Sequence, residues 1–173
     1  MSGDPGPDPP APEAPPAAAP PRRTASVEET EALGEALAPA LACGDVLLLT
    51  GPLGSGKTRF VAGLARGLAA KARVRSPSFT LVNEYRGREL LLVHLDLYRV
   101  EPMDTDALGL EEEIERGALA VEWGEKLPGW LRRGSLALRF DIAGERARVL
   151  TASASPGRGL ELLEAWRRAA GTP

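Results

Sequence analysis

The stretch that decides the fold is Gly51-Pro52-Leu53-Gly54-Ser55-Gly56-Lys57-Thr58. It fits the pattern G-x-x-x-x-G-K-[ST], whose glycines let successive backbone N–H groups converge on phosphate oxygens at a helix N-terminus. In this pattern the lysine, Lys57, bridges the outer phosphates, and the hydroxyl of Thr58 ligates Mg²⁺. The predicted nucleotide contacts in the loop are Leu53, Gly54, Ser55, Gly56, Lys57 and Thr58.

The residues on either side of the loop supply the context that this pattern requires. Residues 45–50 form a short apolar run, which is typical of a parallel strand covered on both faces. Residues 57–70 place apolar side chains at helical spacing. The order strand, glycine loop, helix favours a phosphate-binding loop over a merely structural glycine turn.

Strands and helices alternate further along the chain. A capping-box sequence at Ser26–Glu29 starts a helix that is predicted to end near Cys43–Gly44. The later elements are expected as strands at 79–85, 90–98, 118–123, 136–142 and 146–152 and helices at 108–115 and 156–170. Gly144 is predicted to turn the last two strands into a hairpin. The fold class is therefore α/β and P-loop NTPase-like, with a mainly parallel sheet flanked by helices and an antiparallel hairpin near the C-terminus.

Length and composition restrict the function classes. A chain of 173 residues suffices for one α/β domain and is too short for two. A single cysteine and a single histidine exclude a disulfide or a Cys/His zinc cluster within one chain. A net charge of −3 and a pI near 5.4 give no general basic footprint, so any involvement of RNA is expected to be indirect. No apolar run approaches the ~20 residues that cross a bilayer, and no signal peptide pattern is present, so we expect a cytoplasmic protein without a membrane partner.

The N-terminal segment has a different composition from the rest. Nine of the sixteen prolines fall within residues 1–21, mixed with alanine and glycine, which leaves little large apolar surface to offset the entropy of ordering. We therefore predict that residues 1–24 are a disordered Pro/Ala-rich tail and that residues 25–173 form a single P-loop ATPase domain. A proline-motif docking site is the alternative interpretation of the tail.

Two carboxylates end predicted strands downstream of the loop. Asp96 ends the apolar run at 90–96. A Walker-B acid ends a strand in the same way and lies beside the metal ion bound by the P-loop hydroxyl, here that of Thr58. Glu122 ends the next strand, where a carboxylate could ligate Mg²⁺ or polarise water. Taken alone, each pattern also fits a carboxylate that only ends a strand. His94 shares a strand face with Asp96 and either hydrogen-bonds within the site or fills space.

Other segments bear on the type of reaction. Ser76-Pro77-Ser78-Phe79-Thr80 lies where P-loop proteins keep the switch segment that senses the γ-phosphate, although these are also ordinary loop residues. No Asn-Lys-x-Asp or Thr-Lys-x-Asp follows the loop to read guanine, so ATP is favoured over GTP. Small-molecule kinases close an arginine-bearing lid over their acceptor, and only Arg132-Arg133 would serve here. Arg99 either neutralises phosphate or, as we expect, pairs with the acidic stretch Glu111–Glu113.

Four segments together, in this order and spacing, resemble the TsaE (YjeE) family. They are residues 51–58, the stretch Ser76-Pro77-Ser78-Phe79-Thr80-Leu81-Val82, the stretch His94-Leu95-Asp96-Leu97-Tyr98-Arg99, and Glu122-Trp123. The resemblance covers residues 26–152. Its motifs are highly specific for the family when they occur together: a P-loop, then Ser-Pro-[Ser/Thr]-Phe, then His-x-Asp-x-Tyr-Arg. That family is the ATPase component of the bacterial machinery that makes threonylcarbamoyladenosine beside the tRNA anticodon.

The resemblance implies ATP and Mg²⁺ as cofactors and assigns roles to particular residues. Lys57, Asp96 and Glu122 are the implied catalytic residues. Thr58, Asp96 and Glu122 are the implied metal ligands.

Further positions follow from the resemblance less directly. Ser78 stands where the family usually has threonine and keeps the hydroxyl. The segment Glu28–Thr30 matches one that approaches the nucleotide, so Ser78 and Thr30 join the predicted nucleotide contacts. Pro52 departs from the family, which usually has an acidic residue there, because proline carries neither the charge nor a backbone N–H.

Three functions fit these observations. The first is a Mg²⁺-dependent ATPase whose hydrolysis resets a partner complex, which the resemblance implies is TsaB–TsaD. The second is a small-molecule kinase, and the third is a nucleotide-sensing interaction module that does not hydrolyse ATP. Fast hydrolysis usually needs an arginine at the transferring phosphoryl group, and the sequence places none clearly. We therefore expect the isolated chain to hydrolyse ATP slowly and its partner to accelerate the reaction.

Overall fold

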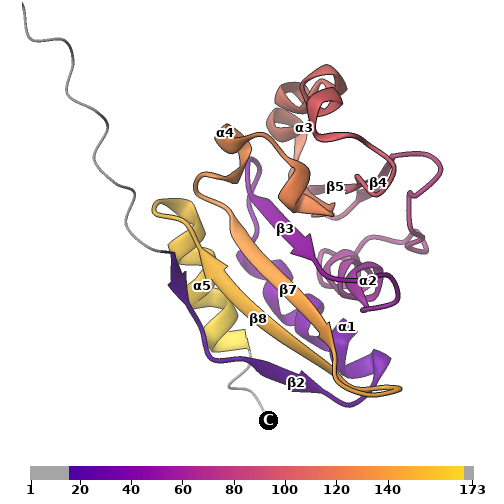
Figure 1. Ribbon diagram of the computed structural model, residues 1–173, viewed down its shortest axis with the longest axis vertical. Helices are drawn as coiled ribbons and strands as arrows, with labels where there is room; N and C mark the ends of the chain where they lie inside the picture. The colour runs from indigo at the N-terminus through magenta and orange to yellow at the C-terminus, as the bar shows by residue number, and fades with distance from the viewer. Residues whose placement is uncertain (1–15, 170–173) are drawn as a thin grey trace, which may run out of the picture.

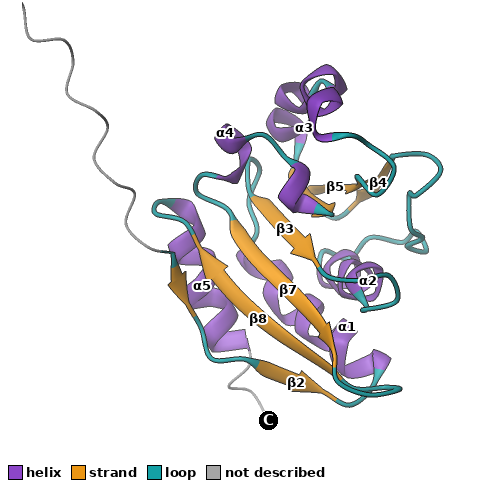
Figure 2. Cartoon of the chain, viewed as in Figure 1, coloured by secondary structure: helices purple, strands orange, loops and turns teal. Residues whose placement is uncertain are grey.

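The computed structural model describes residues 16–169, which form one mixed sheet of eight strands with helices against both faces (Figures 1 and 2). The strands are β1 (Ala17–Ala18), β2 (Arg22–Thr24), β3 (Val46–Thr50), β4 (Val82–Arg86), β5 (Leu91–Asp96), β6 (Ala118–Glu122), β7 (Leu136–Ile142) and β8 (Arg148–Ala154). The helices are α1 (Val27–Leu37), α2 (Lys57–Gly67), α3 (Leu110–Arg116), α4 (Gly129–Arg132) and α5 (Arg158–Ala169), with short 3-10 helices η1 (Ala38–Ala40), η2 (Pro102–Leu108) and η3 (Gly124–Lys126).

The sheet has a parallel centre and antiparallel edges. Its strand order is β1-β8-β7-β3-β6-β5-β4, and β2 also pairs with β8. Strands β7, β3, β6 and β5 run parallel, whereas β8 is antiparallel to β7 and β4 is antiparallel to β5. The predicted fold class, with its C-terminal hairpin, is confirmed. The antiparallel strand β4 and the N-terminal strands at the other edge were not expected.

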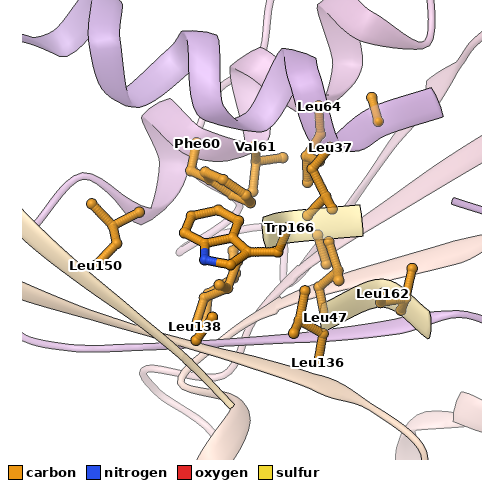
Figure 3. Close-up of a cluster of buried hydrophobic side chains, with 14 of the residues drawn as sticks. Leu37, Leu47, Phe60, Val61, Leu64, Leu136, Leu138, Leu150, Leu162 and Trp166 are labelled. Atoms are coloured by element: carbon orange, nitrogen blue, oxygen red, sulfur yellow. The ribbon is translucent and has the colours of Figure 1, made fainter. Parts of the chain in front are cut away.

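Helices bury a hydrophobic cluster on each face of the sheet. On one face, α1, α2 and α5 pack on β3, β7 and β8 around Trp166, Phe60 and Phe140, which are fully buried (Figure 3). On the other face, Leu110 of α3, Leu131 of α4 and Leu127, which directly follows η3, belong to a second cluster against β5 and β6. Because both faces are covered, the central strands are apolar on both sides, as the short run at 45–50 predicted.

The structure corrects the N-terminal boundary of the domain. Residues 17–18 and 22–24 form strands against β8, so the prediction of a disordered tail is wrong for the described part of residues 1–24. The N–H of Ala19 donates to the carbonyl of Ala152 at 2.9 Å, and Ala19 and Thr24 are buried. Strand β8 presents backbone N–H and C=O groups that need hydrogen-bond partners. These partners are backbone groups, so a segment with small side chains can supply them. Residues 1–15 lie outside the described part of the chain.

Several other element boundaries differ from those expected. Helix α1 ends at Leu37 instead of near residue 43, because Pro39 lacks an N–H and the chain tightens into η1. Strand β4 starts at Val82, because Leu81 has a left-handed backbone with a φ of 68°. The hairpin loop extends over residues 143–147, closed by a 3.0 Å bond from Ala143 N–H to the Ala147 carbonyl, so β8 begins two residues later than expected. The helices η2, η3 and α4 were not predicted.

Within residues 16–169, none of the helices combines the length and the apolar character that crossing a bilayer requires.

Candidate functional site

The predicted site residues gather in one cleft at the carboxyl ends of the central parallel strands. The cleft has a volume of about 430 Å³ and opens over the loop between β3 and α2. Its walls come from this loop, the start of α1, the connection from α2 to β4, the ends of β5 and β6, and the β7–β8 hairpin. The lining residues among those predicted are Thr30, Leu53, Gly54, Ser55, Gly56, Lys57, Thr58, Ser78, Asp96 and Glu122.

The glycine loop has the conformation that phosphate binding requires. Gly56 is the residue before α2 and has a φ of 101°, a region that side-chain-bearing residues rarely adopt. A Cβ atom on Gly51 would lie 2.3 Å from the carbonyl oxygen of Phe140, so this position tolerates only glycine beside β7. The first N–H groups of α2 have no partner within the helix and point to the cleft end of the loop.

Lys57 is the first residue of α2 and is only 4% exposed. Its Nζ donates to the carbonyl oxygens of Gly51 at 2.7 Å and Pro52 at 3.0 Å and lies 4.9 Å from the centre of the Trp123 ring. Trp123 has a left-handed backbone with a φ of 60°. Burial lowers the pKa of Lys57, and the nearby charges of Glu122 and Asp96 oppose that shift. Lys57 is therefore packed into the wall of the cleft and does not project freely from the rim of the loop.

Pro52 takes part in the loop through its carbonyl group. That oxygen accepts from Lys57 Nζ at 3.0 Å and from the N–H of Ser55 at 3.2 Å. Neither contact uses the N–H that proline lacks.

Glu122 faces the P-loop helix from the end of β6. The Thr58 hydroxyl donates to Glu122 Oε1 at 2.6 Å, and His94 Nε2 hydrogen-bonds the same oxygen at 3.0 Å. Glu122 is 4% exposed and His94 is fully buried. Glu122 therefore lies inside the cleft wall and is not an exposed carboxylate at a strand end. His94 Nδ1 is buried and has no hydrogen-bond partner among the described residues.

Asp96 is held by two hydroxyl groups of the predicted switch segment. Its Oδ2 accepts from Ser78 Oγ at 2.7 Å and from Ser76 Oγ at 3.0 Å, and its Oδ1 accepts from the N–H of Tyr98 at 3.0 Å. Asp96 lies beside Glu122 across the parallel pair β5–β6 and is 5% exposed. The segment around Ser76 and Ser78 is thus joined directly to the strand-end acid.

The three predicted metal ligands all present oxygen atoms to the cleft. Mg²⁺ prefers hard oxygen ligands, and Thr58, Asp96 and Glu122 present a hydroxyl and two carboxylates to one cleft, so the set fits that ion. Within residues 16–169, His, Cys, Asp and Glu side chains do not gather in groups of three or more that could hold a metal by themselves. A metal ion at this site would therefore need oxygen atoms from a bound phosphate or water to complete its shell.

Thr30 lines the cleft, and its hydroxyl makes hydrogen bonds within the protein. Its hydroxyl is 2.9 Å from that of Thr24 and donates to the Ser26 carbonyl at 3.1 Å. If residue 56 carried a Cβ atom, that atom would lie 3.7 Å from the Thr30 methyl group. The Thr30 hydroxyl therefore joins α1 to β2, and the Thr30 methyl group lies close to the space that a side chain at position 56 would occupy.

The structure adds two arginines that the sequence patterns missed. Arg146 and Arg148, from the β7–β8 hairpin, line the nucleotide-sized cleft, and Arg148 Nη2 donates to the Gly54 carbonyl at 3.0 Å. No motif marks these residues, because the hairpin reaches the loop only through the tertiary fold.

The other arginines considered for the site lie elsewhere. Arg132 and Arg133 line a larger hollow of about 770 Å³ at the opposite ends of the strands, so they do not cover the cleft. Arg99 stacks on the Phe79 ring at 4.7 Å instead of pairing with the acidic stretch 111–113. Glu113 of that stretch pairs with Arg116.

A glycine loop between a buried strand and a helix, with two strand-end carboxylates beside it, defines an α/β protein of the P-loop class. The profile of the family described as threonylcarbamoyl adenosine biosynthesis protein TsaE matches residues 24–150. The chain belongs to the TsaE family.

Individual relatives agree with this assignment. The tRNA threonylcarbamoyladenosine biosynthesis protein TsaE of Nostoc sp. PCC 7120 is 46% identical over 109 residues, which cover 60% of this chain and 67% of the relative. The protein of the same name from Bacillus subtilis is 39% identical over 137 residues, which cover 79% of this chain and 86% of the relative. The crystal structure of Bacillus subtilis YdiB superposes with a TM-score of 0.73 at 35% identity, covering 90% of this chain and 97% of that one. The fold and the predicted resemblance are thereby confirmed.

Proposed function

We propose that this chain is a Mg²⁺-dependent ATPase that hydrolyses ATP to ADP and phosphate in support of threonylcarbamoyladenosine modification of tRNA. One arrangement carries the proposal: Lys57, Thr58, Asp96 and Glu122 line a single cleft around the glycine loop. Membership of the TsaE family supports the link to the modified nucleoside.

In this proposal the loop and the first turn of α2 bind the phosphates. The Lys57 ammonium exchanges the carbonyl groups of Gly51 and Pro52 for phosphate oxygens, which it neutralises. Thr58, Asp96 and Glu122 are the residues of this cleft that would hold the metal ion. Bound Mg²⁺ supplies charge stabilisation as negative charge shifts during phosphoryl transfer.

The neighbours of the carboxylates orient them before the nucleotide arrives. His94 holds Glu122 from the buried side, and Ser76 and Ser78 hold Asp96. Groups that are already oriented need no rearrangement when the reaction occurs. These contacts therefore support a role in hydrolysis beyond the binding of ATP.

We further propose that the protein binds the TsaB–TsaD complex in the cytoplasm and resets it through hydrolysis, so that tRNA takes part only through that complex. The switch segment at 76–80 is suited to this role, because it contacts Asp96 and also presents Phe79, which is 88% exposed. A partner that orders this segment would thereby act on the site and accelerate a slow basal reaction.

The experiment is a steady-state ATPase assay of the purified chain with and without the TsaB–TsaD pair, at fixed Mg²⁺, with analysis of the products. We expect ADP and free phosphate, formed faster with the pair. A phosphorylated small-molecule acceptor would instead identify a kinase, and unchanged ATP in the presence of the pair would identify a sensor. Equal turnover with and without the pair, together with no binding to either subunit, would overturn the partner-gated proposal.

A further inference from the structure

A second cavity opens next to the nucleotide cleft. It has a volume of about 380 Å³ and lies between α2 and the connection from α2 to β4. Thr58, Arg59 and Ser76 line both this cavity and the cleft, so the two spaces share a wall. Anything bound in the second cavity would therefore lie beside the phosphate end of the loop.

The second cavity is strongly cationic. Three of its lining residues are Arg59, Arg73 and Arg75, and no Asp or Glu lines it within the part of the chain that the structure describes. Arg59 has one ion pair, with Glu31 at 3.5 Å, and its side chain remains 60% exposed. Arg73 and Arg75 are exposed, and their guanidinium groups make no ion pair or hydrogen bond with the part of the chain that the structure describes. In a chain with a net charge of −3, this concentration of positive charge is local.

The backbone at Arg75 is fixed to the sheet by three hydrogen bonds. The N–H of Arg75 donates to the Tyr85 hydroxyl oxygen at 3.1 Å, and that hydroxyl donates back to the Arg75 carbonyl at 3.0 Å. Asn83 Nδ2 donates to the same carbonyl at 3.1 Å. Ser76, the next residue, donates to Asp96. The wall of the cavity at Arg75 is therefore held in place, and the cavity is joined to Asp96 of the cleft through Ser76.

The size and charge of the cavity indicate the class of ligand. Guanidinium groups bind carboxylates and phosphates through paired hydrogen bonds. Surfaces that bind RNA neutralise many phosphates over an extended basic face, whereas this chain has a pI near 5.4 and its arginines cluster within one small cavity. The confined cluster fits a few carboxylates on a folded or extended protein segment better than it fits a nucleic-acid backbone.

We propose that Arg59, Arg73 and Arg75 form a docking pocket for an acidic segment of the protein partner. This proposal rests on the proposed function, because it assumes that the cleft is the ATPase site. The occupant of the pocket would lie beside the phosphate end of the loop and act on Asp96 through Ser76. This contact couples partner binding to the nucleotide site without any residue of the partner entering the cleft.

The test uses the full chain with both Arg73 and Arg75 changed to glutamate. The matched control changes Arg132 and Arg133 to glutamate, which alters the charge equally at the opposite end of the strands. With the TsaB–TsaD pair as probe, we expect the first variant to bind at least about tenfold more weakly at low salt, and the control to bind like the wild type. The affinity of both variants for ATP, measured without the pair, should equal that of the wild type.

A second probe separates this proposal from the proposed function. An oligoglutamate peptide should bind the wild type and the control and lose binding to the Arg73→Glu/Arg75→Glu variant, whether or not the chain binds TsaB–TsaD or hydrolyses ATP. Unchanged binding of both probes to the variant would overturn the pocket. Weakened binding of tRNA alone, with both protein probes unaffected, would also overturn it and would identify RNA as the ligand.

Discussion

The Thr58 hydroxyl donates a 2.6 Å hydrogen bond to Oε1 of Glu122, although 64 positions separate the two residues along the chain. Strands β3 and β6 pair in parallel with Leu49 opposite Glu122, so the helix that follows β3 begins beside the end of β6. The same carboxylate oxygen is held from behind by His94. The wall of the cleft formed by Thr58 and Glu122 is therefore fixed by contacts within the protein.

Replacing Lys57 with alanine should weaken ATP binding. A hydrogen bond to a charged group contributes about 1.5–3 kcal/mol, so we expect the Kd measured by calorimetry to rise about 10- to 100-fold. Because Lys57 is buried against Trp123, the variant should also melt at a lower temperature while keeping its secondary structure. Lys71→Ala, at an exposed position, is the control. Wild-type ATP affinity in a folded Lys57→Ala protein would contradict the assignment.

Removing the charge of Asp96 or Glu122 should impair hydrolysis more than binding, because orientation of a metal ion matters most as charge shifts in the transition state. For Asp96→Asn and Glu122→Gln we expect kcat to fall by about 100-fold or more and the Kd for ATP to change by about tenfold at most. Both variants should need more Mg²⁺ for half-maximal turnover. Glu84→Gln, which removes an exposed carboxylate paired with Arg116, should behave like the wild type. Equal turnover of Asp96→Asn and wild type would refute the role of Asp96.

Deletion of residues 1–24 should destabilise the fold, because it removes β1 and β2, uncovers the edge of β8 and breaks the hydrogen bond between Thr24 and Thr30. We expect the melting temperature to drop by about 5 °C or more. Deletion of residues 1–15 is the matched control, since none of these contacts involves that segment. Identical melting curves for the two deletions would show that pairing with β8 adds nothing measurable to stability.

Arg158→Ala should cost stability at the end of the sheet far from the cleft. Arg158 donates to both carboxylate oxygens of Asp45, at 2.9 and 3.0 Å, and to the Ala40 carbonyl at 2.7 Å. Asp45 is 3% exposed, so losing its partner leaves a buried charge, and we expect the free energy of unfolding to fall by about 2 kcal/mol or more. Urea titration measures this loss. The double variant Arg158→Ala/Asp45→Asn should recover part of it, whereas no recovery would show that the ion pair is not the cause.

Sequence patterns predicted the parts of the site whose chemistry is local. The glycine loop, Lys57 and Thr58 follow from one motif, since a strand, a tight turn and a helix N-terminus in succession leave few conformations to the chain. Asp96 and Glu122 were found because parallel strands deliver their carboxyl ends to one edge of a sheet. Their proximity to each other then depended only on the pairing of β5 with β6.

The tertiary structure alone decided the features that depend on distant pairings. Strand order and hairpin placement, which residue spacing does not encode, decided four features. These are the antiparallel β4, the strands β1 and β2, the burial of Lys57 and the approach of Arg148 to Gly54. The N-terminal strands are the clearest case, because backbone hydrogen bonds to an open edge require no particular side chains and leave no pattern in the sequence. The sequence by itself determined that this protein has a phosphate loop with two acids beside it. Only the fold decided which hydroxyl and guanidinium groups surround them, because those contacts join segments that are far apart along the chain.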